Sequence, residues 1–144
     1  MVKYFILVAF TWLAGRGFSQ GDGHGNLEKE LIGKHKFGVQ FIWDKYGTAE
    51  IKNEKGVLKI SGSQYSNDKS EYCLLEGTIQ MVDAVSFIIT GELKLFTKDC
   101  CGEIKRKGEY FFLCTKNRKF WRYQHFNELC SSDKCAYYLD IFRN

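Results

Sequence analysis

The sequence contains no proline and few of the motifs that mark catalytic or metal-binding chains. Proline lacks the amide hydrogen that a sheet ladder needs, so its absence fits a chain made of strands but does not separate a barrel from a sandwich. The three histidines, His24, His35 and His125, form no HExxH pattern and no ligand cluster, and GxSxG is also missing. We therefore expect solvated histidines, no metal, no cofactor and no enzymatic activity.

Long apolar runs are scarce too, and the one near the start has the layout of a secretory signal peptide. Lys3 precedes the apolar run Tyr4–Gly15, and Gly17-Phe18-Ser19 offers small residues before a cut at Gln20. The run has 12 residues, whereas a membrane helix needs about 20, so we expect cleavage rather than an anchor. The sequence predicts a leader over residues 1–19, secretion or transfer to the periplasm, and no stable membrane span after cleavage.

An excess of one charge is also lacking. The leader holds two of the 21 basic residues and none of the 17 acidic ones, which leaves a net charge near +2 after the cut. Dedicated nucleic-acid-binding domains carry a much larger basic excess. We therefore expect no nucleic-acid partner.

What the chain does contain is alternating apolar residues from Phe37 onward, which predicts β-strands. We expect residues 20–34 to form a flexible N-terminus with one short helical turn over Leu27–Ile32, and residues 35–144 to form one β domain, with a polar loop over Thr97–Lys107. The expected strands are 37–43, 49–51, 57–64, 72–81, 85–96, 108–115, 120–126 and 136–142. Short strands at this spacing predict an antiparallel up-and-down barrel of about eight strands, with a β-sandwich as the alternative.

Three glycines favour the barrel. Gly62, Gly77 and Gly91 each fall in line with the apolar face of their strand. Glycine inside a strand marks a bend, a bulge or a close approach, and neighbouring bends curl a sheet closed.

Leu31-Ile32-Gly33-Lys34-His35-Lys36-Phe37, followed by Gly47-Thr48-Ala49-Glu50-Ile51, resembles the opening of lipocalin-like (calycin-type) barrels. Gly33-Lys34-His35 stands where that family has Gly-x-Trp. The segments 116–124 and 138–142 are similar to small exported bacterial proteins of unknown function. The resemblance implies a barrel that can enclose a cavity, and it transfers no catalytic residues.

Six cysteines follow the leader, and export favours disulfides over a zinc site. In an up-and-down barrel the loops after the fifth and seventh strands lie at one end, so we expect Cys100 or Cys101 to bond Cys130 or Cys135. A local Cys130–Cys135 bridge is the alternative. Cys114 falls at the opposite end, and we expect a buried free thiol there.

Two functions remain open from the sequence. An exported barrel can bind a small apolar ligand inside, and eight strands can also be filled completely by side chains. The expected ligand-lining residues are Phe37, Phe41, Trp43, Ile60, Ile79 and Phe87. The alternative is a cavity-free domain that binds an envelope or extracellular partner through the disulfide-tied loops or through a basic hairpin over residues 116–122, with Arg118, Lys119 and Arg122.

Overall fold

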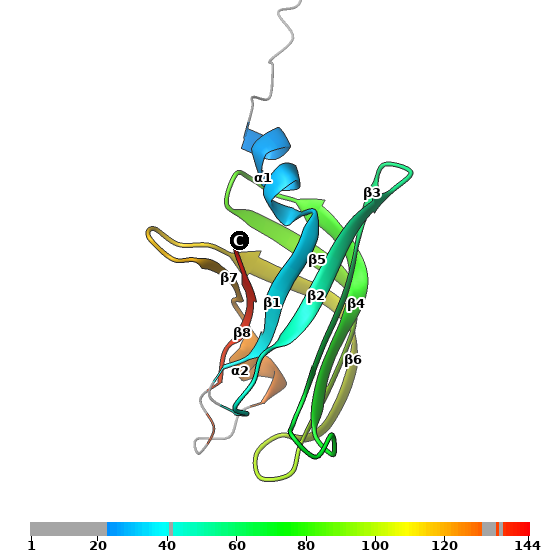
Figure 1. Ribbon diagram of the computed structural model, residues 1–144, viewed down its shortest axis with the longest axis vertical. Coiled ribbons are helices and arrows are strands. Elements are labelled where there is room, and N and C mark those ends of the chain that lie inside the picture. Colours follow the sequence, from blue (N-terminus) through cyan, green and yellow to red (C-terminus); the bar gives the residue numbers. More distant parts are fainter. Residues whose placement is uncertain (1–22, 41, 131–134, 136) are drawn as a thin grey trace, which may run out of the picture.

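The computed structural model describes residues 23–40, 42–130, 135 and 137–144 (Figure 1). The predicted leader and the predicted ligand residue Phe41 lie outside the described residues. Within the described part, the elements are α1 (Gly23–Leu31), β1 (Gly33–Val39), β2 (Gly47–Glu54), β3 (Val57–Tyr65), β4 (Tyr72–Met81), β5 (Ser86–Thr97), β6 (Gly102–Leu113), β7 (Phe120–Tyr123), α2 (Phe126–Leu129) and β8 (Leu139–Phe142). Neither of these helices has the length and apolar character that crossing a bilayer requires.

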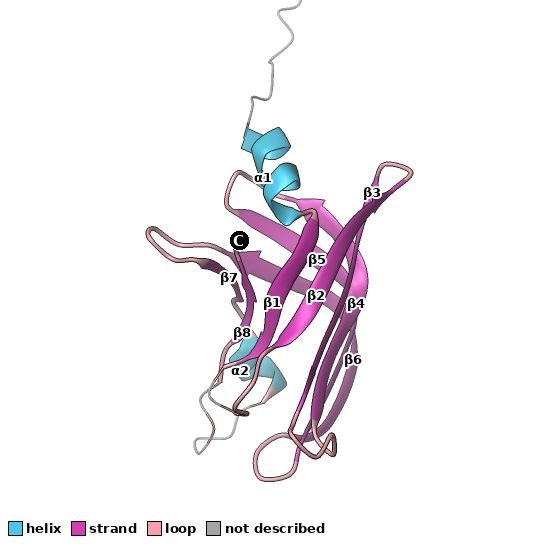
Figure 2. Cartoon of the chain, viewed as in Figure 1, coloured by secondary structure: helices cyan, strands magenta, loops and turns pink. Residues whose placement is uncertain are grey.

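The eight strands form a closed antiparallel barrel in which each strand pairs with the next along the chain. β8 returns to β1, where Phe37 faces Ile141, so the ladder runs unbroken around the barrel. This confirms the predicted up-and-down barrel, and the sandwich alternative is wrong. Figure 2 shows α1 at one end of the barrel and α2 toward the other.

The loop expected over Thr97–Lys107 is wrong in its second half. β6 begins at Gly102, which pairs with Thr97, and its ladder with β5 continues to Leu113. Residues 105–109 are all exposed, so no apolar period marks this part of the strand. Its conformation depends on backbone pairing with β5, which a hydrophobic pattern does not report.

Several element ends also differ from the sequence prediction. β1 stops at Val39 because the Gln64 side chain takes over its hydrogen bonding: Gln64 Oε1 accepts from the Val39 amide at 2.7 Å. β7 stops at Tyr123, and the helix α2 follows instead of more strand. α1 begins at Gly23, four residues before the expected helical turn, and its Leu27 and Leu31 lie one turn apart and both pack into the core.

The glycines explain how the sheet coils. Gly77 faces Gly91, and Gly91 faces Gly108 on the next strand. A Cβ added at Gly77 would lie 2.4 Å from the Thr90 carbonyl oxygen, and one at Gly91 would lie 1.8 Å from the Glu76 carbonyl oxygen. The strands therefore approach more closely here than any side chain allows.

Aromatic rings fill the interior at the α1 end. Phe87 stacks on Phe112 with ring centroids 5.5 Å apart, and Trp121 meets Phe87 edge-on at 5.7 Å. All three side chains are fully buried and belong to the same core cluster as Leu27 and Leu31 of α1. This end is closed by packed side chains.

His35 lies beneath α1 and is buried, so the expectation of a solvated histidine is wrong at this position. Its Nδ1 lies 2.8 Å from the Phe142 carbonyl oxygen and its Nε2 lies 2.6 Å from the Leu31 carbonyl oxygen. The ring also meets Trp121 edge-on at 5.9 Å. His35 thereby ties the end of α1 to the end of β8.

Candidate functional site

The expected ligand-lining residues lie mostly inside the barrel core. Phe37, Ile60, Ile79 and Phe87 are buried and belong to one cluster of packed side chains. Trp43 is half-buried in the loop between β1 and β2, and its Nε1 donates to Glu71 Oε2 at 3.2 Å. The structure therefore brings four of the six residues together in a packed interior and holds Trp43 over the end opposite α1.

Two disulfides tie the loops at that end, here called the disulfide end. Cys100 bonds Cys135 and Cys101 bonds Cys130. The predicted bonding between these two loops is confirmed, and the local Cys130–Cys135 bridge is wrong. The bonds fix Cys130 and Cys135 to the loop between β5 and β6.

The remaining cysteines, Cys73 and Cys114, are free and buried, as expected for Cys114. Burial raises the pKa of the Cys73 thiol to about 12. A thiol with that pKa is a poor nucleophile near neutral pH. Among the described residues, no group of three histidine, cysteine, aspartate or glutamate side chains is arranged to hold a metal ion.

The outer face of β7, β8 and β1 carries a buried ion pair. Arg122 Nε donates to Asp140 Oδ1 at 2.8 Å, and Arg122 Nη2 donates to Asp140 Oδ2 at 2.9 Å. Asp140 is fully buried and also accepts from Gln40 Nε2. Two parallel bonds and a third donor satisfy this carboxylate, so it fixes the Arg122 guanidinium in one position.

Aromatic rings surround that guanidinium. Arg122 Cζ lies 3.8 Å from the centroid of the Tyr138 ring and 4.6 Å from that of Phe120. The pKa of Arg122 is raised, chiefly by the hydrogen bonds that its guanidinium donates to Asp140. The contacts combine a fixed cation with two ring faces, an arrangement in which cation and ring quadrupole attract.

A second cation continues the pattern toward β1. Lys36 Nζ lies 4.2 Å from the Phe142 ring centroid and 4.9 Å from that of Tyr46. The Phe142 and Tyr46 rings meet edge-on at 5.0 Å, and Phe142 lies 5.7 Å from Phe120. The pKa of the Tyr46 hydroxyl is raised, first by burial and then by Asp140. We call the continuous surface the aromatic–cationic face; its members are Lys36, Tyr46, Phe120, Arg122, Tyr138 and Phe142.

The basic hairpin expected from the sequence meets this face at one edge. Arg118 lies over the Phe120 ring at 5.5 Å, and Lys119 is exposed beside it. Arg122 differs from both because Asp140 already neutralises it. The sequence analysis singled out these three cations but missed Lys36, Tyr46 and Asp140, whose neighbours are distant in sequence.

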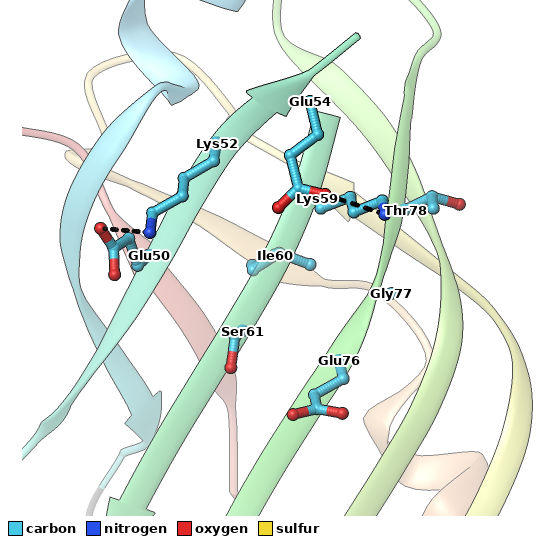
Figure 3. Close-up of a pocket in the computed structure, with 9 residues that line it drawn as sticks. All are labelled: Glu50, Lys52, Glu54, Lys59, Ile60, Ser61, Glu76, Gly77 and Thr78. Carbon is cyan, nitrogen blue, oxygen red and sulfur yellow. Dashed lines mark ion pairs between the residues drawn. The ribbon is translucent and has the colours of Figure 1, made fainter. Parts of the chain in front are cut away.

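The opposite wall of the barrel has a different surface. A hollow of about 440 Å³ lies on the outer face of β2, β3 and β4, and its lining alternates glutamates, lysines and hydroxyl groups (Figure 3). Lys52 pairs with Glu50 at 3.5 Å and Lys59 with Glu54 at 2.9 Å, as the dashed lines in the figure mark. The lysines of this hollow are therefore balanced by carboxylates.

Comparison with known proteins assigns the chain to a family. The model of the PM1083 family matches residues 19–143. The protein titled "Uncharacterized protein PM1083" from Pasteurella multocida (strain Pm70) is 39% identical over 123 residues, which cover 81% of this chain and 75% of that protein. No solved structure matches the chain. Since the family model spans the whole barrel and the similarity covers most of both proteins, this chain belongs to the PM1083 family.

Proposed function

We propose that this protein is an exported binding domain that recognises a partner through the outer surface of its barrel and not through a ligand enclosed inside it. The observation that carries the proposal is the packed interior. Phe37, Ile60, Ile79 and Phe87 share one buried cluster in which aromatic rings stack directly on one another. A ligand there would have to displace side chains that already contact each other, at the cost of those contacts.

Three features support export. The N-terminal run Tyr4–Gly15 has the layout of a signal peptide. The family match begins at residue 19, next to the cut expected before Gln20. The two disulfides are of the kind that persists in oxidising compartments. Export to the periplasm or to the outside accounts for all three.

Export has a direct test. The whole sequence is expressed in a Gram-negative host, and the protein is recovered from the periplasmic and extracellular fractions. Its mass and N-terminal sequence are then measured. We expect a chain that begins at Gln20. An uncut chain in the membrane fraction would contradict cleavage, and an uncut chain in the cytoplasmic fraction would contradict export.

A small apolar ligand is the second candidate function. Several apolar side chains at the disulfide end are only half-buried, where the mouth of a lipocalin-like barrel would lie. These side chains are Ile42, Trp43, Ile104, Leu129 and Tyr137. Movement of the loop that carries Trp43 would widen the space they line.

Titration with an apolar fluorescent probe separates the two candidates. We expect the unaltered protein to show no saturable uptake. Phe87→Ala is the positive control, because it removes a ring that packs on both Phe112 and Trp121 and leaves an apolar cavity. Ile79→Ala is a milder replacement control if the first variant does not fold. Saturable uptake by the unaltered protein, displaced by an unlabelled apolar compound, would overturn the proposal in favour of the enclosed ligand.

A further inference from the structure

We propose that the aromatic–cationic face binds an anionic polysaccharide. This inference rests on the proposed function, since it names the partner class of the same outer surface. Three properties of the face favour such a ligand: its unbalanced positive charge, the fixed position of its groups and the partly exposed rings of Tyr46 and Tyr138.

The charge on this face is positive and unbalanced. Asp140 neutralises Arg122, but within the part of the chain that the structure describes no carboxylate forms an ion pair with Lys36 or Arg118. Lys34 and Lys119 are exposed, and no ion pair joins either to a carboxylate within the described residues, although Lys34 faces Glu50 across the β1–β2 ladder. By contrast, the lysines of the hollow in Figure 3 have carboxylate partners. A polyanion is therefore attracted to this face and not to the hollow in Figure 3.

The groups on the face are held in place before any partner arrives. Three hydrogen bonds fix the Arg122–Asp140 pair, and the rings of Tyr138 and Phe120 contact the guanidinium. Lys36 rests on two further rings. Groups that are already ordered lose less conformational entropy on binding, which favours recognition of an extended ligand.

The accessible parts of the rings suit a sugar better than a nucleobase. Tyr46 is 36% exposed and Tyr138 is 40% exposed, yet each has a cation over its ring face. A nucleobase needs an open ring face for stacking, and a cation lies over one face of each ring, whereas an acidic sugar binds chiefly through its charged and hydroxyl groups. Tyrosine combines an apolar body with a polar hydroxyl, which matches the apolar and hydroxyl surfaces of a sugar ring. Carboxylate or sulfate groups of the polymer then pair with Lys36 and Arg118.

The test uses the protein produced from its whole sequence and purified in the form the cell releases. Binding is measured by fluorescence titration against alginate and heparin as acidic polysaccharides, dextran as a neutral one, and single-stranded oligothymidine as a different polyanion. We expect saturable binding to at least one acidic polysaccharide, none to dextran, and at least tenfold weaker binding to the oligonucleotide.

Two paired variants test the face itself. Lys36→Ala with Arg118→Ala should weaken binding at least tenfold, and so should Tyr46→Ala with Tyr138→Ala, which leaves the charges in place. Lys52→Ala with Lys59→Ala is the matched control, since it removes two cations from the opposite wall. It should leave affinity within about twofold of the unaltered protein, because those cations lie outside the proposed surface.

Three results would overturn the inference: no binding to either acidic polysaccharide, equal binding to the oligonucleotide, or equal losses in the control variant. The proposed function is tested separately, because apolar-probe uptake by the interior or failure of export would overturn it, whereas the polysaccharide result would not. Absence of polysaccharide binding together with an inaccessible interior would reject this partner and retain an outer-surface binding domain.

Discussion

β4 and β5 pair through ten residue positions, whereas β7 pairs with β6 through two positions and with β8 through three. The long wall, β2 to β6, is therefore a backbone ladder with exposed ion pairs on its outer side. The short wall, β7, β8 and β1, has few ladder bonds. Side chains hold these strands together instead, through the Arg122–Asp140 pair and the two disulfides at the disulfide end.

The difference shows how a barrel can close with short strands. An unpaired strand edge exposes backbone donors and acceptors, and long strands satisfy them through the sheet. The short wall must hold its strands by contacts between residues far apart in sequence: Gln40 and Asp140 are 100 positions apart. The same contacts order the cations and rings that make up the aromatic–cationic face, so closure and proposed recognition depend on one set of residues.

The largest expected effect comes from breaking the buried ion pair of the short wall. Asp140→Asn leaves the Arg122 guanidinium without its counter-charge, and the free energy of unfolding should fall by about 3 kcal/mol. Urea denaturation followed by tryptophan fluorescence measures it. Glu50→Gln is the long-wall control, because it breaks an exposed pair with Lys52 and should cost less than about 1 kcal/mol. Equal costs for the two variants would remove the distinction between the walls.

Removing a disulfide should cause the next largest loss of stability. Cys101→Ser with Cys130→Ser opens a link between residues 29 positions apart and should cost about 2–4 kcal/mol. Hydrogen exchange localises the effect: amides of β7 and β8 should exchange faster, while those of β4 and β5 remain protected. A uniform rise of exchange over both walls would show that the barrel opens as one unit.

A smaller loss should follow from adding a methyl group to the long wall. Gly77→Ala places a Cβ against the Thr90 carbonyl oxygen and should cost about 1–3 kcal/mol. Gly108→Ala is the matched control, because an added Cβ there meets nothing within 4 Å. It should be neutral or stabilise by about 0.4–1 kcal/mol through the unfolded chain. The midpoints of thermal unfolding of the two variants measure the difference. Similar midpoints would mean that the strands can relax around the side chain added at Gly77.

The smallest expected effect is a difference between the alkylation rates of the two free thiols, Cys73 and Cys114. Cys73 lies in the long wall and its pKa rises from 9.0 to about 12, so its reaction with iodoacetamide at pH 8 should require global unfolding. Cys114 follows the last residue of β6, next to the short wall, and should react through local opening. Mass spectrometry of trapped peptides over time distinguishes the rates. Rapid alkylation of Cys73 in the folded protein would contradict the rigidity assigned to the long wall.

The raised pKa of Cys73 also makes the stability of the fold depend on pH. The unfolded chain loses the Cys73 proton near pH 9, whereas the folded chain keeps it until about pH 12. The folded state therefore binds more protons than the unfolded chain in this range. The contribution of Cys73 to the free energy of unfolding falls as the pH rises from 9 to 12. Comparing urea midpoints of the unaltered protein and Cys73→Ala across that range isolates this contribution.

The sequence by itself determined the class of the fold and the end at which the disulfides form. Alternation at Leu58, Ile60, Leu75 and Ile79 reports which side of each strand is buried, because neighbouring side chains on a strand point to opposite faces. In a meander, the order of the strands determines which loops lie at the same end of the barrel. This order was sufficient to predict that Cys100 or Cys101 bonds Cys130 or Cys135.

Only the tertiary structure decided that Phe37, Ile60, Ile79 and Phe87 share one buried cluster and that the aromatic–cationic face exists. Asp140 carries no local signal of its role, because its partners Arg122 and Gln40 come from elements 18 and 100 positions away. The exposed part of β6 was missed for a related reason, since its pairing with β5 uses backbone groups that every residue has. Local patterns record burial along one strand, whereas closure and the meeting of distant side chains depend on how all the strands coil together.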